Sequence, residues 1–302
     1  MEINLIPERL RRLEIPSRVE IVNGQGGLPL VKITTPWSMA EIYLLGAHVA
    51  GFQKNGEPPL LFMSAKSWFA DGKPIRGGVP ICFPWFGPRE GEPAHGLARI
   101  RTWELGETSA ASDGRVTVRL RLPGESLKPE WSALRTVFVL TVGETLTMEL
   151  VATNESAEKT LVIENCLHTY FQVGDVNGVM LAGLQGAPFD DFAFGANGAR
   201  RNGDPALLGI TQETNRVYPD NTAAVEIRDA SLKRVIRVEK FNAQSTVVWN
   251  PWTTQKMPED WGQADFQQMV CVESGNVKQN KLSLAPGKTA ALKVVISSAP
   301  LK

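Results

Sequence analysis

The chain has 302 residues, of which 43% are hydrophobic and 21% charged, a composition typical of a folded globular protein. A chain of this length can bury a large core without disulfides or metals. Lys+Arg and Asp+Glu both number 32, so the formal net charge is zero, which argues against nucleic-acid or membrane-surface binding because both need a basic excess.

The first predicted element is a short helix over residues 7–12. Its charged residues, among them Glu8, Arg9 and Arg11, occupy the stretch in which a secretory signal would need an apolar core. No later apolar run approaches the roughly 20 residues of a membrane span. The three cysteines lie far apart, as in proteins of a reducing compartment. We therefore expect a cytoplasmic protein that does not bind membranes.

Period-two alternation of apolar and polar residues dominates the rest of the chain. It is cleanest at residues 116–122 (VTVRLRL) and indicates half-buried strands with one wet face. In chain order, the predicted strands cover residues 41–45, 116–122, 137–142, 146–150, 161–173, 235–239, 246–250 and 292–297. Further helical signal is confined to residues 64–69 and 263–268.

The spacing of these strands indicates the fold class. They are short and mostly bounded by turn signals such as Asp113-Gly114 and Asn197-Gly198, a pattern that predicts a large antiparallel sandwich or barrel. The sequence contains no linker, low-complexity segment or clear repeat. We expect an all-β protein with few short helices, in a single domain over residues 1–302, since all-β domains of about 200–250 residues are routine.

Histidines are scarce, and only His48, His95 and His168 could act as an acid or base near neutral pH. His168 lies in a strand-like run, where alternation puts Cys166, His168 and Tyr170 on one face. For a lone histidine in a strand, a hydrogen bond within the sheet is the commoner role, and catalysis is the alternative.

Glu273 ends an otherwise apolar run, next to Gly275. Such a carboxylate is either a solvated strand end or a group aimed into a pocket. Cys166 and His168 are two residues apart, as are Cys271 and Glu273, so each pair can share a strand face. Four metal-ligand side chains would converge if the two strands were neighbours. The spacing matches no common zinc signature, and buried free cysteines usually behave as small hydrophobes, so we predict no metal.

Residues 76–88 (RGGVPICFPWFGP) combine glycines and prolines with aromatics that are too apolar for an ordinary exposed loop. The segment is either a loop that packs against the core or a stiff pocket wall with Arg76 at the pocket entrance. In the second case its aromatic rings could stack on a sugar and Arg76 could bind an anion. Residues 95–99 add Arg99 beside His95. Two local arginines fit a small phosphate better than a neutral sugar, although unpaired surface arginines are commoner.

Six short blocks in this sequence, taken in order, resemble the glucose-6-phosphate 1-epimerase family, also called hexose-6-phosphate mutarotases. They are residues 76–80 (RGGVP), 83–87 (FPWFG), 95–99 (HGLAR), 167–171 (LHTYF), 248–252 (VWNPW) and 270–273 (VCVE). Each block alone is a weak motif, but six such blocks in the order of the family are a specific signal for it. The resemblance implies a galactose-mutarotase-like supersandwich, a large antiparallel β-sandwich whose concave face holds the sugar.

The resemblance also implies roles for individual residues. His168 and Glu273 match the catalytic pair of the family, and Arg76 and Arg99 match its substrate-binding arginines. His95 matches a histidine beside the sugar in related mutarotases.

Two positions depart from the family pattern. Ala94 stands where the family usually has Gln, and Asn215 stands where it usually has a substrate-binding Asp. Asn215 can accept a hydrogen bond from a sugar hydroxyl but carries no charge. The lost carboxylate and amide weaken the case for glucose in particular and leave the acid–base pair intact.

The implied activity is the interconversion of the α and β anomers of glucose 6-phosphate or a related hexose 6-phosphate. A hemiacetal ring opens when a base removes the anomeric proton and an acid protonates the ring oxygen, each within about 3 Å of its proton. We expect Glu273 to be the base and His168, as an imidazolium, to be the acid, since a nearby carboxylate would favour that form. No redox step is needed, so no cofactor is expected, and the expected partner is a small sugar phosphate.

Two other functions stay open at this point. A carbohydrate-binding or regulatory homologue would keep the pocket and lose efficient catalysis; Ala94 and Asn215 favour this reading, and the retention of His168 and Glu273 opposes it. An aldose 1-epimerase acting on a non-phosphorylated sugar would have no use for two arginines. The preferred hexose and the oligomeric state also stay open.

Overall fold

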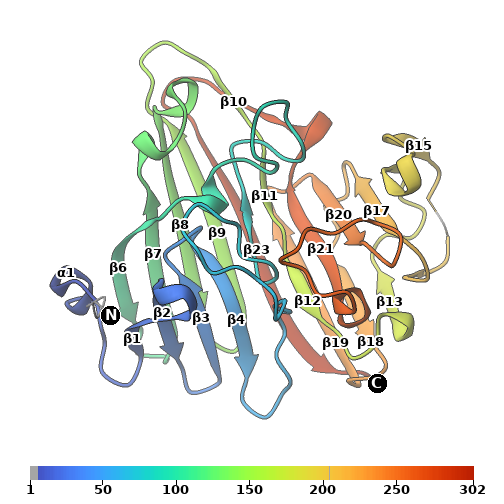
Figure 1. The fold of residues 1–302 in the computed structure, drawn as a ribbon, viewed down its shortest axis with the longest axis horizontal. Helices are drawn as coiled ribbons and strands as arrows, with labels where there is room; N and C mark the ends of the chain where they lie inside the picture. Colours follow the sequence, from blue (N-terminus) through green and yellow to red (C-terminus); the bar gives the residue numbers. More distant parts are fainter. Residues whose placement is uncertain (1–5, 204) are drawn as a thin grey trace.

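The computed structural model describes residues 6–203 and 205–302, and antiparallel strands dominate it (Figure 1). The α-helix of this part of the chain is α1 (Glu8–Arg11), inside the expected stretch 7–12. The remaining helical segments are short 3-10 helices: η1 (Gln25–Gly27), η2 (Ala98–Ile100), η3 (Gly124–Ser126), η4 (Pro129–Trp131), η5 (Val176–Gly178), η6 (Ala193–Gly195), η7 (Asp265–Gln268) and η8 (Lys278–Asn280). The segment η7 lies inside the expected stretch 263–268.

The helix expected over residues 64–69 does not form. The loop that follows holds this backbone instead, because the Ser64 N–H donates to the Arg76 carbonyl and the Ser67 hydroxyl accepts from the Arg76 N–H. A segment bonded to a distant loop cannot satisfy the same groups with helical bonds between near neighbours. The prediction was wrong because a tertiary contact outweighs the local signal.

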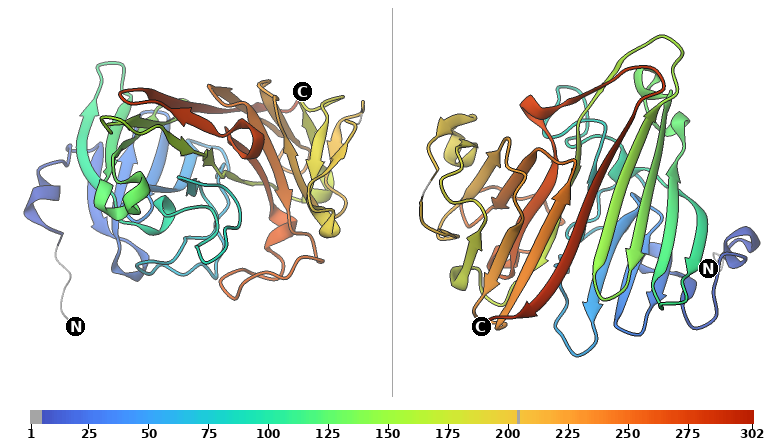
Figure 2. Two further views of the ribbon diagram at one scale, coloured as in Figure 1. Left: turned by 90° about the horizontal axis from the view of Figure 1, so that it is seen from above. Right: turned by 180° about the vertical axis from the view of Figure 1, so that it is seen from behind.

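A nine-stranded antiparallel sheet forms the back of the molecule (Figure 2). In spatial order its strands are β16 (Leu208–Gly209), β13 (Val179–Ala182), β18 (Val225–Asp229), β19 (Arg234–Phe241), β23 (Thr289–Pro300), β9 (Leu146–Asn154), β8 (Leu134–Val142), β7 (Val116–Leu122) and β6 (Glu104–Ala110). Every second side chain of β7 is buried, as expected of a strand with one face on the core. Five of the predicted strands lie here: 116–122, 137–142, 146–150, 235–239 and 292–297.

Two further sheets pack against this large sheet. The first contains β1 (Val19–Asn23), β2 (Pro29–Thr34), β3 (Ser38–Tyr43) and β4 (His48–Lys54). The second contains β15 (Ala199–Arg201), β14 (Phe189–Asp191), β17 (Thr214–Tyr218), β20 (Ser245–Asn250), β21 (Met269–Asn276), β11 (Asn165–Leu167) and β5 (Ile81–Cys82), with β12 (Tyr170–Gln172) also paired to β21. One cluster of buried side chains, including Ile33, Phe138 and Val272, joins all three sheets. The predicted antiparallel sandwich is confirmed.

The predicted strand 161–173 is three strands. β10 (Leu161–Ile163) pairs with β22 (Leu282–Leu284), whereas β11 and β12 pair with β21. The chain leaves the sheet at His168, whose N–H donates to the carbonyl of Pro80. His168, at this interruption, borders the pocket described below.

Within residues 6–203 and 205–302, no helix has the length and apolar character needed to cross a bilayer. Cys82, Cys166 and Cys271 are all buried and unbridged. The single domain over residues 1–302 stays a prediction, and residues 1–5 lie outside the described part.

Candidate active site

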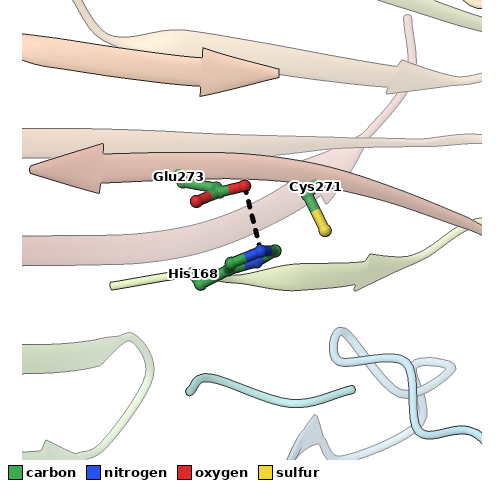
Figure 3. Close-up of side chains that lie close together, drawn as sticks. All are labelled: His168, Cys271 and Glu273. Carbon is green, nitrogen blue, oxygen red and sulfur yellow. Dashed lines mark ion pairs between the residues drawn. The ribbon is translucent and has the colours of Figure 1, made fainter. Parts of the chain in front are cut away.

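The predicted acid and base are in direct contact. His168 Nε2 lies 3.3 Å from Glu273 Oε1, and both side chains are almost inaccessible, at 8% and 1% exposure (Figure 3). His168 lies between β11 and β12, Glu273 lies within β21, and both short strands pair with β21. The register of the sheet therefore sets the distance between the two groups.

Burial controls the protonation of Glu273. It raises the pKa of this carboxyl well above its ordinary value, while a hydrogen bond from Cys166 and the charge of Arg99 act in the opposite direction. The Cys166 thiol donates to Oε2 over 3.7 Å. The protonated carboxyl is favoured at rest.

His168 is stacked flat on Tyr170, with ring centroids 4.8 Å apart and an interplanar angle of 7°. Burial, and then the charge of Arg99, lower the pKa of His168 to about 3. The expectation that the carboxylate would favour the imidazolium was wrong, because desolvation penalises both charges of a buried pair. Burial thus favours a neutral imidazole beside a protonated carboxyl. His168 Nδ1 has no hydrogen-bond partner among the described residues.

The pair borders a cavity of about 400 Å³, within the range of about 300–1,000 Å³ for small-molecule sites. Trp249, on β20, and Trp261 form its aromatic wall with Tyr170. Their rings lie 6.0 Å and 5.9 Å from that of Tyr170. Such rings offer apolar faces on which the C–H groups of a sugar can pack.

Two guanidinium groups border the same cavity. Arg76 Nε donates to Asp260 Oδ2 over 2.8 Å, and Asp260 is almost fully buried, so Arg76 is held in one orientation by a buried partner. Arg99 Nη2 donates to the carbonyl of Ala94 over 2.7 Å. Both predicted arginines therefore lie where an anionic ligand could reach them.

His95 lies against His168, with its ring centroid 5.4 Å from that of His168 and 4.9 Å from that of Phe86. Its backbone has a left-handed φ of 65°. The next residue must be Gly96, since a Cβ there would lie 2.1 Å from the carbonyl oxygen of Phe83. The ring position is thus fixed by a tight loop packed on residue 83.

All six predicted site residues border this one cavity: Arg76, His95, Arg99, His168, Asn215 and Glu273. Ala94 borders it as well. The Asn215 carbonyl accepts the N–H of Phe192, which also lines the cavity.

Other cavity residues carry no readable signal in the sequence. Trp249 and Trp261 are indistinguishable there from core tryptophans, and Lys278 resembles any surface lysine. Asp260 could have been suspected only as an acid in a Trp-rich stretch.

The alternative of a metal site has a geometric basis. His168, Cys271 and Glu273 each offer a ligand atom, and these atoms lie within 4.8 Å of one another (Figure 3). The strands carrying these residues are neighbours, as that alternative required. Cys166 is directed to Glu273 and is not part of this group.

Comparison with known proteins places the chain among sugar epimerases. The sequence model of a family described as aldose 1-epimerase matches residues 29–297. A protein of Salmonella typhimurium (strain LT2), provisionally named glucose-6-phosphate 1-epimerase, is 32% identical over 255 residues, which are 82% of this chain and 83% of that protein.

Solved structures agree with this match. The crystal structure of YeaD from Salmonella typhimurium, provisionally described as a mutarotase, aligns with a TM-score of 0.86 at 28% identity over 97% of this chain and 98% of that one. A galactose mutarotase-like protein from Clostridium acetobutylicum, at 12% identity, has a TM-score of 0.71 over 93% and 98% of the chains and shares the fold. The predicted galactose-mutarotase-like fold is confirmed.

Proposed function

Because the chain belongs to the aldose 1-epimerase family and is therefore an isomerase, we propose that it interconverts the α and β anomers of a hexose 6-phosphate. The observation that carries the proposal is the contact of His168 with Glu273 at the wall of a sugar-sized, aromatic-lined cavity. A binding protein would not need two buried proton-transfer groups side by side.

The neutral pair holds the protons that ring opening requires. An imidazole beside a carboxyl contains the same number of protons as an imidazolium beside a carboxylate, and one proton shift across the 3.3 Å contact converts one into the other. In the second form, Glu273 takes the proton of the anomeric hydroxyl and His168 gives its proton to the ring oxygen as the ring C–O bond breaks. Rotation about the C1–C2 bond and closure in reverse give the other anomer.

The spacing of the pair suits this exchange. The anomeric hydroxyl oxygen and the ring oxygen are bonded to the same carbon, so an acid and a base in mutual contact can each reach one of them. Arg76 and Arg99 would hold the phosphate and keep the ring in register while its anomeric face changes. Asn215 would accept a bond from a sugar hydroxyl.

Magnetisation-transfer NMR on glucose 6-phosphate tests the proposal directly. Replacing His168 by Ala should lower the rate of anomer exchange about 10²–10⁴-fold, the usual contribution of a general acid. The matched control is His48→Gln, which alters a buried histidine outside the cavity and should retain exchange.

Free glucose and galactose 6-phosphate, measured alongside, define the substrate. Acceleration of phosphorylated sugars alone supports the proposal, whereas equal acceleration of free glucose supports an epimerase of non-phosphorylated sugars. Tight binding without acceleration of any sugar would contradict catalysis and favour the binding protein.

A further inference from the structure

Lys278, the first residue of η8, borders the cavity two residues after the end of β21, and the proposed acid–base chemistry does not use it. Its backbone has a left-handed φ of 57°, and its N–H donates to the carboxylate of Glu164. A residue other than glycine keeps such a conformation where its surroundings fix it. The start of the Lys278 side chain is therefore anchored at the cavity wall.

The ammonium group of Lys278 lies against an aromatic ring and a glycine. Nζ lies 5.4 Å from the ring centroid of Phe192, and a Cβ on Gly87 would be only 3.3 Å from it, so Nζ rests against that glycine. The positive charge reaches His95 and adds to the lowering of its pKa, which burial dominates. In the described part of the chain, no carboxylate forms an ion pair with Nζ.

The other charged groups at the cavity differ in whether an acid neutralises them. Arg76 is paired with buried Asp260. Burial favours the neutral form of the pair formed by His168 and Glu273. Arg99 is a buried cation whose Nη2 donates to a backbone carbonyl, not to an acid.

Residue 215 adds no negative charge to the cavity, because it is an asparagine. Asn215 borders the cavity, and its carbonyl holds the N–H of Phe192, whose ring lies beside Lys278 Nζ. An amide brings no negative charge to this side of the cavity. Among the described residues, Lys278 and Arg99 thus border the cavity without an ion pair to a carboxylate, while Lys256 lies exposed at the rim.

We propose that Lys278 binds the phosphate group of the substrate and contributes to a preference for phosphorylated over free sugars. The proposal rests on the proposed function for the identity of the ligand. An ammonium group forms strong, charge-assisted hydrogen bonds with a phosphate. Because Nζ already rests against a ring and a glycine, little rotamer freedom remains to be lost on binding.

The test compares Lys278→Met with Lys281→Met, which removes the same charge from an exposed lysine three residues away. Lys278→Met should raise the KM for glucose 6-phosphate by on the order of 10- to 100-fold, the effect of one hydrogen bond to a charged group. The kcat, and any exchange of free glucose, should stay within about twofold. Lys278→Arg, which retains the charge, should restore part of the lost affinity. Equal KM values in the two Met variants would overturn the proposal.

Titration calorimetry with glucose 6-phosphate and glucose separates this proposal from the proposed function. If the wild type accelerates no sugar but binds glucose 6-phosphate more tightly than glucose, and Lys278→Met abolishes that difference, the role of Lys278 stands although the catalytic proposal fails. If the wild type binds both sugars equally, or Lys278→Met keeps the difference while melting like the wild type, the role of Lys278 is wrong.

Discussion

The Cys166 thiol touches the proposed base and gives a residue-scale prediction. It donates to Glu273 Oε2, and this bond lowers the pKa of a carboxyl that burial raises. In Cys166→Ala the pKa of Glu273 should rise further, so the alkaline limb of the pH–rate profile should move to higher pH. Turnover should fall by about two- to tenfold at most, the effect of one neutral hydrogen bond.

Cys166→Ser is the matched control for this change, because its hydroxyl keeps a donor at the same place. Its alkaline limb should stay close to that of the wild type. If the profile of the Ala variant superimposes on that of the wild type, Cys166 only fills space beside the carboxyl.

The cluster of His168, Cys271 and Glu273 allows a second residue-scale prediction. Its ligand atoms are close enough for a metal, but ring opening by proton transfer needs none. Anomer exchange should therefore be unchanged after dialysis against a chelator, and elemental analysis should find no stoichiometric metal. Lost turnover that returns with added zinc would replace the acid–base pair by a metal site.

The loop around Gly96 carries a prediction at the scale of elements. Gly96 has a φ of 79°, and a Cβ there would collide with the carbonyl of Phe83. Gly96→Ala should cost about 1–3 kcal/mol of stability through backbone strain and should displace His95, lowering kcat/KM. Gly91 has a similar φ of 70° with nothing within 4 Å of a Cβ, so Gly91→Ala is the matched control. Equal melting temperatures and kcat/KM values in the two variants would contradict the role of the contact.

Strands with one solvent-exposed face were predictable from the sequence, whereas the bounds of strands buried on both faces were harder to predict. β7 was predicted to the residue because its alternation records one buried and one exposed face. The run 161–173 carries polar and apolar residues on both faces, and its residues 165–171 are all buried, so periodicity gives no sign of its interruptions. Its break at His168 depends on a hydrogen bond to Pro80, a residue 88 positions away. Such a partner exists only in the folded chain.

The candidate site also contains residues that the sequence predicts and residues that it does not. Arg76 and Arg99 were recognisable from the sequence, because they lie in blocks that resemble a known family and their glycine- and aromatic-rich contexts are unusual in a surface loop. Asp260 and Lys278 have ordinary contexts. Their importance is visible only in the structure, where Asp260 forms a buried ion pair and Lys278 has an anchored left-handed backbone. Neither feature can be predicted from the neighbouring residues in the sequence.

At the scale of the whole molecule, three sheets around one core bury His48 and His168 and leave His95 half-buried at the cavity. The pKa values of His48 and His168 are lowered to about 3, and that of His95 is lowered well below its ordinary value. An unfolded histidine has a pKa of about 6.5. Below that pH the unfolded chain binds more protons than the folded one, so the free energy of unfolding falls as the pH is lowered.

Glu273 acts in the opposite direction. Its raised pKa means that the folded chain keeps a proton that the unfolded chain loses above about pH 4.5, so this group lowers stability as the pH rises. Between pH 7 and pH 5 the lowered pKa values of His48 and His168, at about 3, each cost about 2 kcal/mol of stability; the lowered pKa of His95 adds to this loss and the raised pKa of Glu273 offsets part of it. The free energy of unfolding should therefore be lower at pH 5 than at pH 7, and should decline again in alkaline solution.

Denaturant unfolding at pH 5, 7 and 9 measures how the free energy of unfolding depends on pH, and the variant His48→Gln isolates the contribution of one histidine. That variant removes a buried histidine outside the cavity, so its loss of stability between pH 7 and pH 5 should be smaller than that of the wild type by about 2 kcal/mol. If His48→Gln and the wild type lose the same free energy of unfolding between pH 7 and pH 5, burial does not hold His48 neutral and its lowered pKa is wrong.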